Sequence, residues 1–418
     1  MTALEVRLQD ELLGGEVLVG ILSKRSGRTG EAIDFEYASE WLRRRGPIRA
    51  FALDLDLPLA PGKHYARTGA SELSGAFQDC SPDRWGSLLM QRRELIEAKE
   101  QGRQPRALRA WDYLVGVNDE GRMGAIRLRE PGTGSYLDAR SLSAPPLTEL
   151  RTLEAIALQL DEGREDWTDE QLRWIKPLIA PAASLGGARP KASFRDEDGA
   201  LWIAKFPSAQ DTHDVGLWEY VTHRLALMAG ITMPQAKILR LSSHGHTFAV
   251  KRFDRSNAAR RCYASAMTML GASDSDGRSY LDIAEVIESS GAAHRIDQEL
   301  EQLFRRVFFG ILVGNRDDHL RNHGFLRESD GWALSPAFDI NPSTAKDVHV
   351  LAIDESDPSP CTQSALRTAE YYRIKQPRAM AIAQEVRQAV IDWEHHAASV
   401  GAKRLEIELM RSVIDPER

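Results

Sequence analysis

The sequence has few cysteines and no long apolar segment. Its 418 residues include 3 cysteines, Cys80, Cys262 and Cys361, which are scattered and lack the spacing of a zinc ligand set. So few cysteines exclude a disulfide-stapled secreted domain and fit a reducing compartment. The longest apolar run, residues 307–313, is too short to span a bilayer, and the polar residues 1–10 predict no signal peptide. We therefore expect a cytoplasmic protein without membrane contact.

The sequence also lacks a net positive charge. It holds 54 lysines and arginines against 61 acidic residues, which gives a formal net charge of -7 at pH 7. This balance opposes nonspecific binding to nucleic acid, and no helix-turn-helix or zinc-finger signature is present. Basic clusters such as residues 43–45 are typical of solvated surfaces. We therefore expect any contact with DNA to be made through a partner protein.

An apolar helix is predicted before a polar loop in the carboxyl-terminal half. Its apolar positions recur at i, i+3, i+4 and i+7, the period of a largely buried helix. They are Leu300, Leu303, Phe304, Val307, Phe308, Ile311 and Leu312. Gly314 is expected to end the helix, because glycine adopts the left-handed conformation without steric cost. The loop at residues 315–322 therefore begins at the end of a rigid element.

A short hairpin is predicted after this loop. Residues 324–326 and 332–334 form its strands, and residues 329–331 form the turn. In an antiparallel hairpin the start of the first strand lies beside the end of the second. Asn322 comes just before the first strand and Asp339 just after the second. We therefore expect Asn322 and Asp339 to lie at the same open end.

Two carboxylates and an amide then meet at the end of this hairpin. Phosphoryl transfer needs an acid that accepts a hydroxyl proton, and an acid and an amide that hold Mg²⁺ on the nucleotide phosphates. Asp317, Asn322 and Asp339 supply these groups, with the Asp-x-x-x-x-Asn spacing of protein kinases. Residues 315–316 differ from the usual His-Arg, and residues 339–341 differ from Asp-Phe-Gly. The sequence predicts a phosphotransfer centre, but not an ordinary protein kinase.

Other interpretations of the loop stay open at this point. Taken singly, Asp and Asn residues in a loop cap helices or form turns. His319 and His323 lie four residues apart with Asp317 close by, and zinc hydrolases use such clusters. That spacing favours a metal only if both histidines share one face of a helix, whereas the hairpin start at Gly324 favours a loop. A zinc hydrolase is the remoter alternative.

A loop of small residues lies upstream, where a kinase binds nucleotide phosphates. Residues 184–191 include Ser184, Gly186 and Gly187, and glycine lets backbone N–H groups approach phosphate oxygens closely. The loop leads into a predicted hairpin that ends at Lys205, so the hairpin returns Lys205 to the neighbourhood of the loop. We expect the Lys205 ammonium to bind nucleotide phosphates.

The next predicted helix carries Glu219. This acid is a candidate partner for Lys205, because kinases pair a strand lysine with a helix glutamate. Two predicted strands follow, and the connector at residues 251–255 falls where a two-lobed kinase has its hinge. Backbone groups of such a hinge pair with adenine, so Phe253, at the centre of the connector, is expected to contact ATP.

Several segments, taken together, match one protein family. They are residues 184–191, 202–207, 250–255, 314–322 and 336–340, with residues 35–37, 81–86 and 112–117 in the amino-terminal region. In these segments the sequence resembles the HipA family, the kinase toxins of bacterial toxin–antitoxin modules, and the resemblance covers most of the chain. The resemblance implies that Asp317 is the catalytic acid/base, that Asn322 and Asp339 bind Mg²⁺, and that Lys205 and His319 bind ATP.

The resemblance also implies regulation and partners. Ser184 is expected to be autophosphorylated, and the added negative charge in a loop that receives ATP phosphates would move the loop out and switch the kinase off. A small, HipB-like, DNA-binding antitoxin would bind the kinase and repress the operon. The substrate would be a protein of translation, such as an aminoacyl-tRNA synthetase, whose phosphorylation inhibits growth.

The expected fold is α+β. It is a two-lobed, protein-kinase-like (HipA-like) fold with an extra N-terminal α/β subdomain and an all-helical C-terminal lobe. The expected domains are residues 1–145, residues 146–255 and residues 256–418. The second domain holds the glycine loop, residues 184–191. The third holds the expected catalytic loop, residues 315–322, and the expected metal loop at Asp339. An amphipathic run at residues 378–413 closes the chain. Its predicted buried face holds Ile382, Val386, Val390, Ile391 and Trp393.

Two alternatives of a different class remain beside the kinase toxin. One is a small-molecule phosphotransferase on the same fold. The other is a non-catalytic, nucleotide-sensing binding module.

Overall fold

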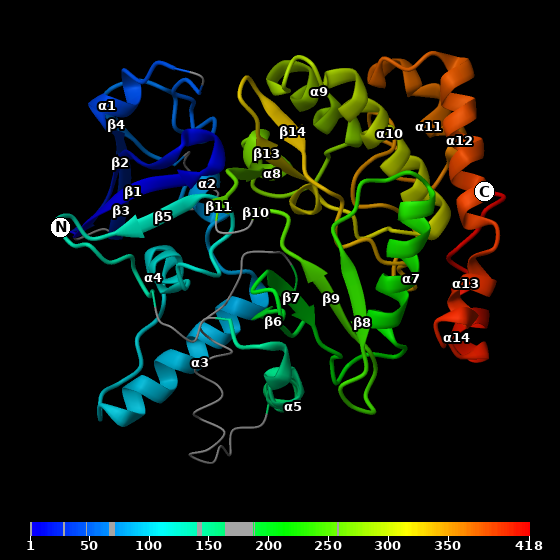
Figure 1. Ribbon diagram of the computed structural model, residues 1–418, viewed down its shortest axis with the longest axis horizontal. Coiled ribbons are helices and arrows are strands. Elements are labelled where there is room, and N and C mark those ends of the chain that lie inside the picture. Colours follow the sequence, from blue (N-terminus) through cyan, green and yellow to red (C-terminus); the bar gives the residue numbers. More distant parts are fainter. Residues whose placement is uncertain are drawn as a thin grey trace. The chain divides into compact units, whose positions relative to one another are not determined.

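The computed structural model describes residues 2–27, 30–46, 48–66, 72–139, 144–163, 187, 189–256 and 259–418. The chain forms two compact units, whose elements are labelled in Figure 1. The first unit comprises Met1–Ala209 with Asp254–Ala264, and the second comprises Gln210–Phe253 with Ser265–Arg418. The predicted division into domains at residues 1–145, 146–255 and 256–418 stays a prediction.

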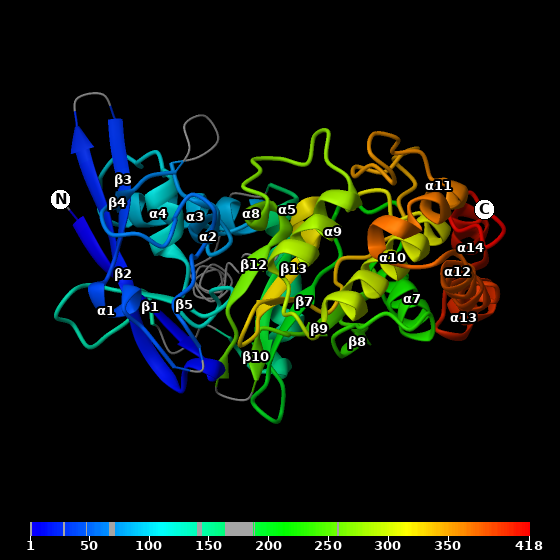
Figure 2. The same cartoon turned by 90° about the horizontal axis from the view of Figure 1, so that it is seen from above.

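A seven-stranded sheet forms much of the first unit. Its strands are β1 (Thr2–Asp10), β2 (Gly15–Gly27), β3 (Gly30–Tyr37), β4 (Lys63–His64), β5 (Ile126–Arg129), β10 (Arg255–Ser256) and β11 (Ala259–Arg260). The order is β10-β11-β1-β2-β3-β4, and β5 pairs with β1. Leu4, Val6 and Leu8 of β1 are buried while their neighbours are not. This alternation is that of a strand with one face on a core, and the long β1 and β2 stand out in Figure 2.

The first unit also contains five helices among its described residues. They are α1 (Ser39–Leu42), α2 (Gly75–Gln78), α3 (Arg84–Glu100), α4 (Ala110–Gly116) and α5 (Leu150–Asp161), with short 3-10 turns η1 (Glu11–Leu13) and η2 (Leu147–Glu149). Asp83 caps α3, because its Oδ1 accepts a hydrogen bond from the backbone nitrogen of Gly86 at 2.7 Å. Its Oδ2 lies 2.5 Å from Nζ of the buried Lys191. The start of α3 is thereby bound to Lys191, the last residue of the glycine loop.

The hairpin predicted after the glycine loop is present. Strands β6 (Lys191–Arg195) and β7 (Leu201–Lys205) pair antiparallel, with Lys191 opposite Lys205. The backbone nitrogen of Phe206 also donates to the carbonyl oxygen of Pro190 at 2.8 Å. The hairpin therefore returns Lys205 to the carboxyl end of the glycine loop.

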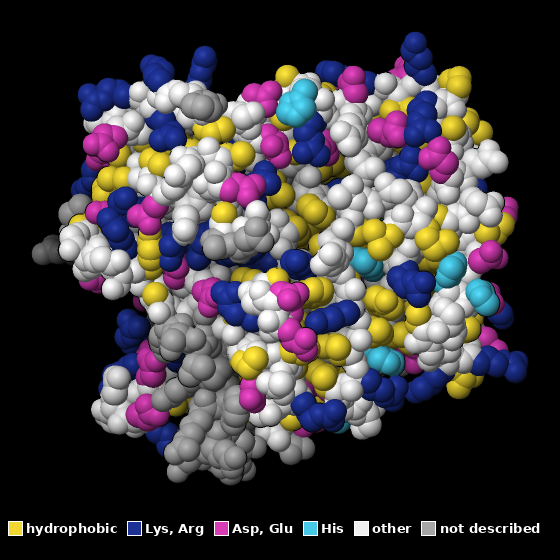
Figure 3. Space-filling model, viewed as in Figure 1, with side chains coloured by type: hydrophobic (Ala, Val, Ile, Leu, Met, Phe, Trp, Pro, Cys, Tyr) yellow, Lys and Arg dark blue, Asp and Glu magenta, His cyan; other side chains and the backbone are white. Residues whose placement is uncertain are grey.

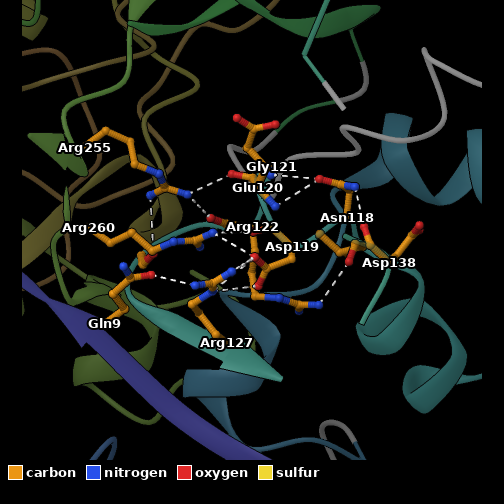
Figure 4. Close-up of polar contacts among 12 residues, drawn as sticks. Gln9, Asn118, Asp119, Glu120, Gly121, Arg122, Arg127, Asp138, Arg255 and Arg260 are labelled. Carbon is orange, nitrogen blue, oxygen red and sulfur yellow. Dashed lines mark hydrogen bonds and ion pairs between the residues drawn. The ribbon is translucent and has the colours of Figure 1, made fainter. Parts of the chain in front are cut away.

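The segment Asp254–Ala264 belongs to the first unit although it follows a strand of the second. The buried Asp254 accepts a hydrogen bond from the backbone nitrogen of Gly124 at 2.7 Å. Arg255 donates to the carbonyl oxygens of Glu120 and Arg122 at 3.0 and 2.6 Å. These contacts, several of which are drawn in Figure 4, fix the segment to the loop between α4 and β5.

The second unit is mainly helical and carries two hairpins. Its helices are α7 (Val215–Met228), α8 (Ala266–Met269), α9 (Tyr280–Ser290), α10 (Ile296–Val313), α11 (Thr362–Arg367), α12 (Gln376–Val390), α13 (Trp393–Ser399) and α14 (Arg404–Met410), with 3-10 turns η3 (Leu320–Asn322) and η4 (Ala369–Tyr372). One hairpin is β8 (Ala236–Leu239) with β9 (Thr247–Lys251), and the other is β13 (Gly324–Arg327) with β14 (Trp332–Leu334). Strand β12 (Tyr263–Ser265) lies where the chain passes from the first unit to the second.

The amphipathic run predicted at the carboxyl end is three helices, α12 to α14. Ile382, Val386, Val390 and Trp393 are buried as predicted. Ile391 is 49% exposed, so its predicted burial is wrong. The reason is that α12 ends at Val390 and a new helix starts at Trp393, which breaks the helical period at Ile391.

No helix in the described part of the chain is long and apolar enough to cross a membrane. On the face drawn in Figure 3, lysine and arginine side chains are interspersed with acidic ones. That face therefore lacks a broad field of one sign, in keeping with the net charge of -7.

Candidate active site

Helix α10 delivers the loop that holds the candidate catalytic residues. The helix ends at Gly314, whose φ of 67° is left-handed, so the predicted end of the helix is confirmed. A Cβ on Gly314 would lie 2.3 Å from Cγ1 of Val413. Both the conformation and the space therefore require glycine here. The loop starts from a fixed point, since the nitrogen of Asn315 donates to the carbonyl oxygen of Gly310 at 2.9 Å.

Asp317 and Asn322 lie together in this loop. Asn322 ends the short turn η3, and its Nδ2 is 3.4 Å from the carbonyl oxygen of Asp317. Its Oδ1 is buried and has no hydrogen-bond partner within the described residues. The Asp317 side chain is 66% exposed, and Nζ of Lys346 lies 2.5 Å from its Oδ1. The loop therefore presents a solvent-accessible carboxylate beside an unused amide oxygen.

Asp339 is connected to the same loop by hydrogen bonds of Asn341. It follows the β13–β14 hairpin with a φ of 58°, which is rare for a residue with a side chain. The Nδ2 of Asn341 lies 3.3 Å from Oδ1 of Asp339, while the nitrogen of Asn341 donates to Oδ1 of Asn315 at 3.1 Å. Asn341 thus links Asp339 to the start of the catalytic loop. Strained backbone of this kind is concentrated at functional sites, so it favours Asp339 as a candidate.

Helix α7 supports the Asp339 segment from another side. The hydroxyl of the buried Thr222 donates to the carbonyl oxygen of Ile340 at 2.7 Å. Glu219, on the same helix, is also buried, at 3% exposure. The helix that carries the predicted glutamate therefore holds the backbone next to the predicted metal ligand.

Phe253, the predicted hinge residue, stacks on Phe338. The ring centroids lie 5.4 Å apart and the planes are inclined by 30°. Both rings are partly exposed, and Phe338 directly precedes Asp339. An aromatic surface therefore adjoins the Asp339 segment. Phe338 belongs to the family-like segment at residues 336–340, but the sequence alone predicts no role for it.

Of the other predicted nucleotide-binding residues, His319 lies in the second unit, and the rest lie in the first unit or outside the described part. Lys205 ends β7 and is 9% exposed, and Gly187 has a φ of 104°. Ser184 and Gly186 lie outside the described residues. The ion pair between Lys205 and Glu219 stays a prediction.

The side chains in the second unit fit a magnesium ion that is held partly by phosphate. Mg²⁺ prefers oxygen ligands and usually takes one or two from the protein, with phosphates and waters completing its shell. The unpartnered Oδ1 of Asn322 and the carboxylate of Asp339 are oxygen donors of this kind. Within the residues described, no group of three or more His, Cys, Asp and Glu side chains is placed to hold a metal ion. The zinc alternative therefore has no ligand set in that part of the chain.

Asp318, in the loop at residues 315–322, belongs to a buried polar network. The Oη of Tyr280 donates to Oδ2 of Asp318 at 2.9 Å, and Nε2 of His323 lies 3.1 Å from Oδ1. Burial raises the pKa of the Asp318 carboxyl, but the charge of His323 and the hydrogen bonds from His323 and Tyr280 outweigh it and lower the pKa. His319 is partly exposed, and its Nδ1 has no hydrogen-bond partner among the residues described. Asp318 therefore faces the interior, whereas Asp317 faces solvent.

Replacing Tyr280 by Phe is expected to destabilise the second unit by about 1 to 3 kcal/mol, because a buried carboxylate loses a donor. Urea denaturation followed by tryptophan fluorescence measures the change. Tyr371→Phe is the matched control, since that side chain is 54% exposed and its loss should cost at most about 0.5 kcal/mol. Equal midpoints for the two variants would show that Asp318 does not depend on Tyr280.

The chain is similar to proteins of one known family. The HipA-like C-terminal domain family matches residues 183–393, about half of the chain. Y4dM of Sinorhizobium fredii is 30% identical over 159 residues, which cover 34% of this chain and 37% of Y4dM. The serine/threonine-protein kinase toxin HipA of Shewanella oneidensis is 26% identical over 263 residues, which cover 55% of this chain and 59% of the toxin. The alignments thus span only part of either relative.

One solved structure resembles this protein over nearly the whole chain. A chain in the complex of Shewanella oneidensis HipA, HipB and operator DNA matches with a TM-score of 0.63 at 16% identity, over 98% of this chain and 94% of that chain. The predicted α+β, kinase-like fold of HipA is confirmed. With half of its length matched by the family and its fold shared with HipA, the chain belongs to the HipA-like C-terminal domain family.

Proposed function

We propose that this chain is an Mg-ATP-dependent serine/threonine protein kinase. One observation carries the proposal: Asp317, Asn322 and the Asp339 segment are joined by hydrogen bonds in one unit, with the Asp317 carboxylate exposed and the Asn322 amide oxygen unused. Phosphoryl transfer needs this set of groups. The kinase name of the Shewanella oneidensis relative supports the same activity.

In the proposed reaction, Asp317 is the proton acceptor. A substrate hydroxyl donates its proton to the Asp317 carboxylate while its oxygen attacks the γ-phosphorus of ATP, and ADP leaves with the electron pair of the broken P–O bond. Asn322 and Asp339 would hold Mg²⁺, whose charge offsets that of the phosphate oxygens. The hydrogen bonds of Asn341 connect the Asp339 carboxylate to Asn315 at the start of the loop, so the carboxylate needs little reorganisation.

The nucleotide-binding residues predicted from the sequence are also part of the proposal. Lys205 and Gly187 would contact phosphates, with Glu219 orienting Lys205. His319, whose Nδ1 is unpartnered among described residues, would donate to the nucleotide. Phe253 would border adenine, and its stacking on Phe338 supports this placement because two aromatic rings give a flat apolar surface.

We further propose that the kinase is the toxin of a toxin–antitoxin module and phosphorylates a protein of translation. The match to a chain from a HipA, HipB and operator DNA complex supports a HipB-like antitoxin as partner, which co-purification with the protein of an adjacent reading frame tests. Ser184 would be the autophosphorylation site. Mass spectrometry that finds Ser184 unmodified after incubation with Mg-ATP would contradict that assignment.

Labelled ATP tests the activity itself. Purified protein with γ-labelled ATP and Mg²⁺ is expected to label a protein in cell lysate, EDTA is expected to abolish the labelling, and excess Mg²⁺ is expected to restore it. Label found only on a small molecule would favour a small-molecule phosphotransferase. Nucleotide binding without any transfer would favour a nucleotide-sensing module and overturn the proposal.

A further inference from the structure

Lys346 lies against the proposed catalytic carboxylate although the two residues are 29 positions apart. Its Nζ is 2.5 Å from Oδ1 of Asp317. The lysine comes from the segment after Asp339, which no local sequence pattern connected with the catalytic loop. The contact adds a cation to a site that otherwise offers a carboxylate and an amide.

The backbone around Lys346 is held in place by the catalytic loop. Nη1 of Arg316, which is 8% exposed, donates to the carbonyl oxygen of Lys346 at 2.5 Å. The nitrogen of Ser343 donates to the carbonyl oxygen of Gly314 at 2.9 Å, and that of Val350 donates to Arg316 at 3.1 Å. Bonds on both sides therefore fix the segment, so the main chain of Lys346 is anchored while its side chain is 42% exposed.

The contribution of this ion pair to folding stability is too small to explain its presence. The side chains are 42% and 66% exposed, and pairs as exposed as these contribute little to folding. The arrangement becomes favourable if the ammonium has a second anionic partner during the reaction.

The transferring phosphoryl group is such a partner. Its charge spreads over three oxygens close to the attacking hydroxyl, and cations placed there stabilise the transition state. The catalytic loop itself holds no lysine between Asp317 and Asn322. Its arginine, Arg321, directs Nε to Sδ of Met267 at 3.2 Å. Lys346 is therefore the lysine that the structure places beside Asp317.

We infer that Lys346 is a further catalytic residue, which binds the γ-phosphoryl group of ATP beside Asp317. This inference rests on the proposed kinase function. During transfer the bond between substrate oxygen and γ-phosphorus forms, the bond to the β-phosphate oxygen breaks, and its electron pair leaves with ADP. The hydroxyl proton passes to Asp317. Lys346 transfers no proton, and its ammonium stays bound to the phosphoryl oxygens during the transfer.

Nucleotide binding tests this role without reference to turnover. Calorimetry compares Mg-ADP with the Mg complex of a non-hydrolysable ATP analogue, because only the analogue carries a γ-phosphate. Lys346→Met is expected to weaken binding of the analogue about 10- to 100-fold, the effect of losing one charge-assisted hydrogen bond, and to leave ADP binding unchanged. Lys346→Arg should retain part of the preference. Lys375→Met, at an exposed lysine before α12, is the matched control and should change neither affinity.

The outcomes separate this inference from the proposed function. If wild-type protein binds both nucleotides and Lys346→Met weakens both equally or neither, the Lys346 assignment is overturned while the kinase proposal stands. If wild-type protein binds neither nucleotide, both are overturned. In a transfer assay beside wild type, Lys346→Met should lower kcat more than it raises KM for ATP. A faster Lys346→Met enzyme would make the ion pair an inhibitory contact and refute the inference.

Discussion

Replacing Asp317 by Asn is expected to lower phosphoryl transfer about 10²- to 10⁴-fold, the usual effect of losing a general base. An amide has almost the shape of a carboxylate but does not accept the hydroxyl proton. Because the Asp317 side chain is 66% exposed, the fold should tolerate the change. Binding of Mg-ATP should persist, since Asn322 and Asp339 are the proposed metal ligands. The loss should therefore appear in kcat, measured with labelled ATP.

A nearby acid provides the control for this experiment. Asp347 is exposed and follows Lys346 directly, so Asp347→Asn removes the same charge from the same surface without removing the proposed base. It should transfer phosphate at close to the wild-type rate. If Asp317→Asn retains full activity, another group accepts the proton and the assignment of Asp317 fails. If both variants lose activity equally, the surface charge matters rather than the base.

Local sequence patterns predicted the elements that position this site. The apolar period of α10, the glycine at its end and the turn residues of the β13–β14 hairpin each act over a few neighbouring residues. Strand β1 was not predicted, although Leu4, Val6 and Leu8 alternate with polar residues as in a half-buried strand. The predicted burial of Ile391 was wrong, because the break between two helices has no strong sequence signal there.

Long-range contacts explain what the sequence did not predict about the site. The pairs Lys346–Asp317 and Tyr280–Asp318 join residues 29 and 38 positions apart. The stacking of Phe253 on Phe338 joins a strand to a loop much farther along the chain. No period or spacing encodes such contacts, because they depend on how separate elements pack. Spacing along the chain therefore predicts candidate catalytic residues, but it does not predict the groups that surround them.

A buried carboxylate in the first unit leads to the second prediction with a large expected effect. Asp119 is 4% exposed and binds two arginines, Arg127 and Arg260, as Figure 4 shows. Nη2 of Arg260 lies 2.8 Å from the carbonyl oxygen of Asp119 and 3.2 Å from its Oδ2. Burial lowers the pKa of Arg260 to about 10, while the charge of Asp119 opposes this shift. Asp119 therefore compensates a buried cation on the segment that follows the predicted hinge.

Replacing Asp119 by Ala is expected to destabilise the first unit by about 3 to 5 kcal/mol, because Arg260 remains buried without its compensating charge. The segment Asp254–Ala264 would lose its attachment first, since Arg260 lies within it. Urea denaturation measures the loss, and limited proteolysis should show new cleavage within this segment. Glu97→Ala is the control, because the Glu97 side chain is 39% exposed and pairs with Arg93 at only 3.8 Å. If Asp119→Ala is no less stable than Glu97→Ala, the buried pair does not hold the segment, and backbone bonds such as that between Gly124 and Asp254 are sufficient.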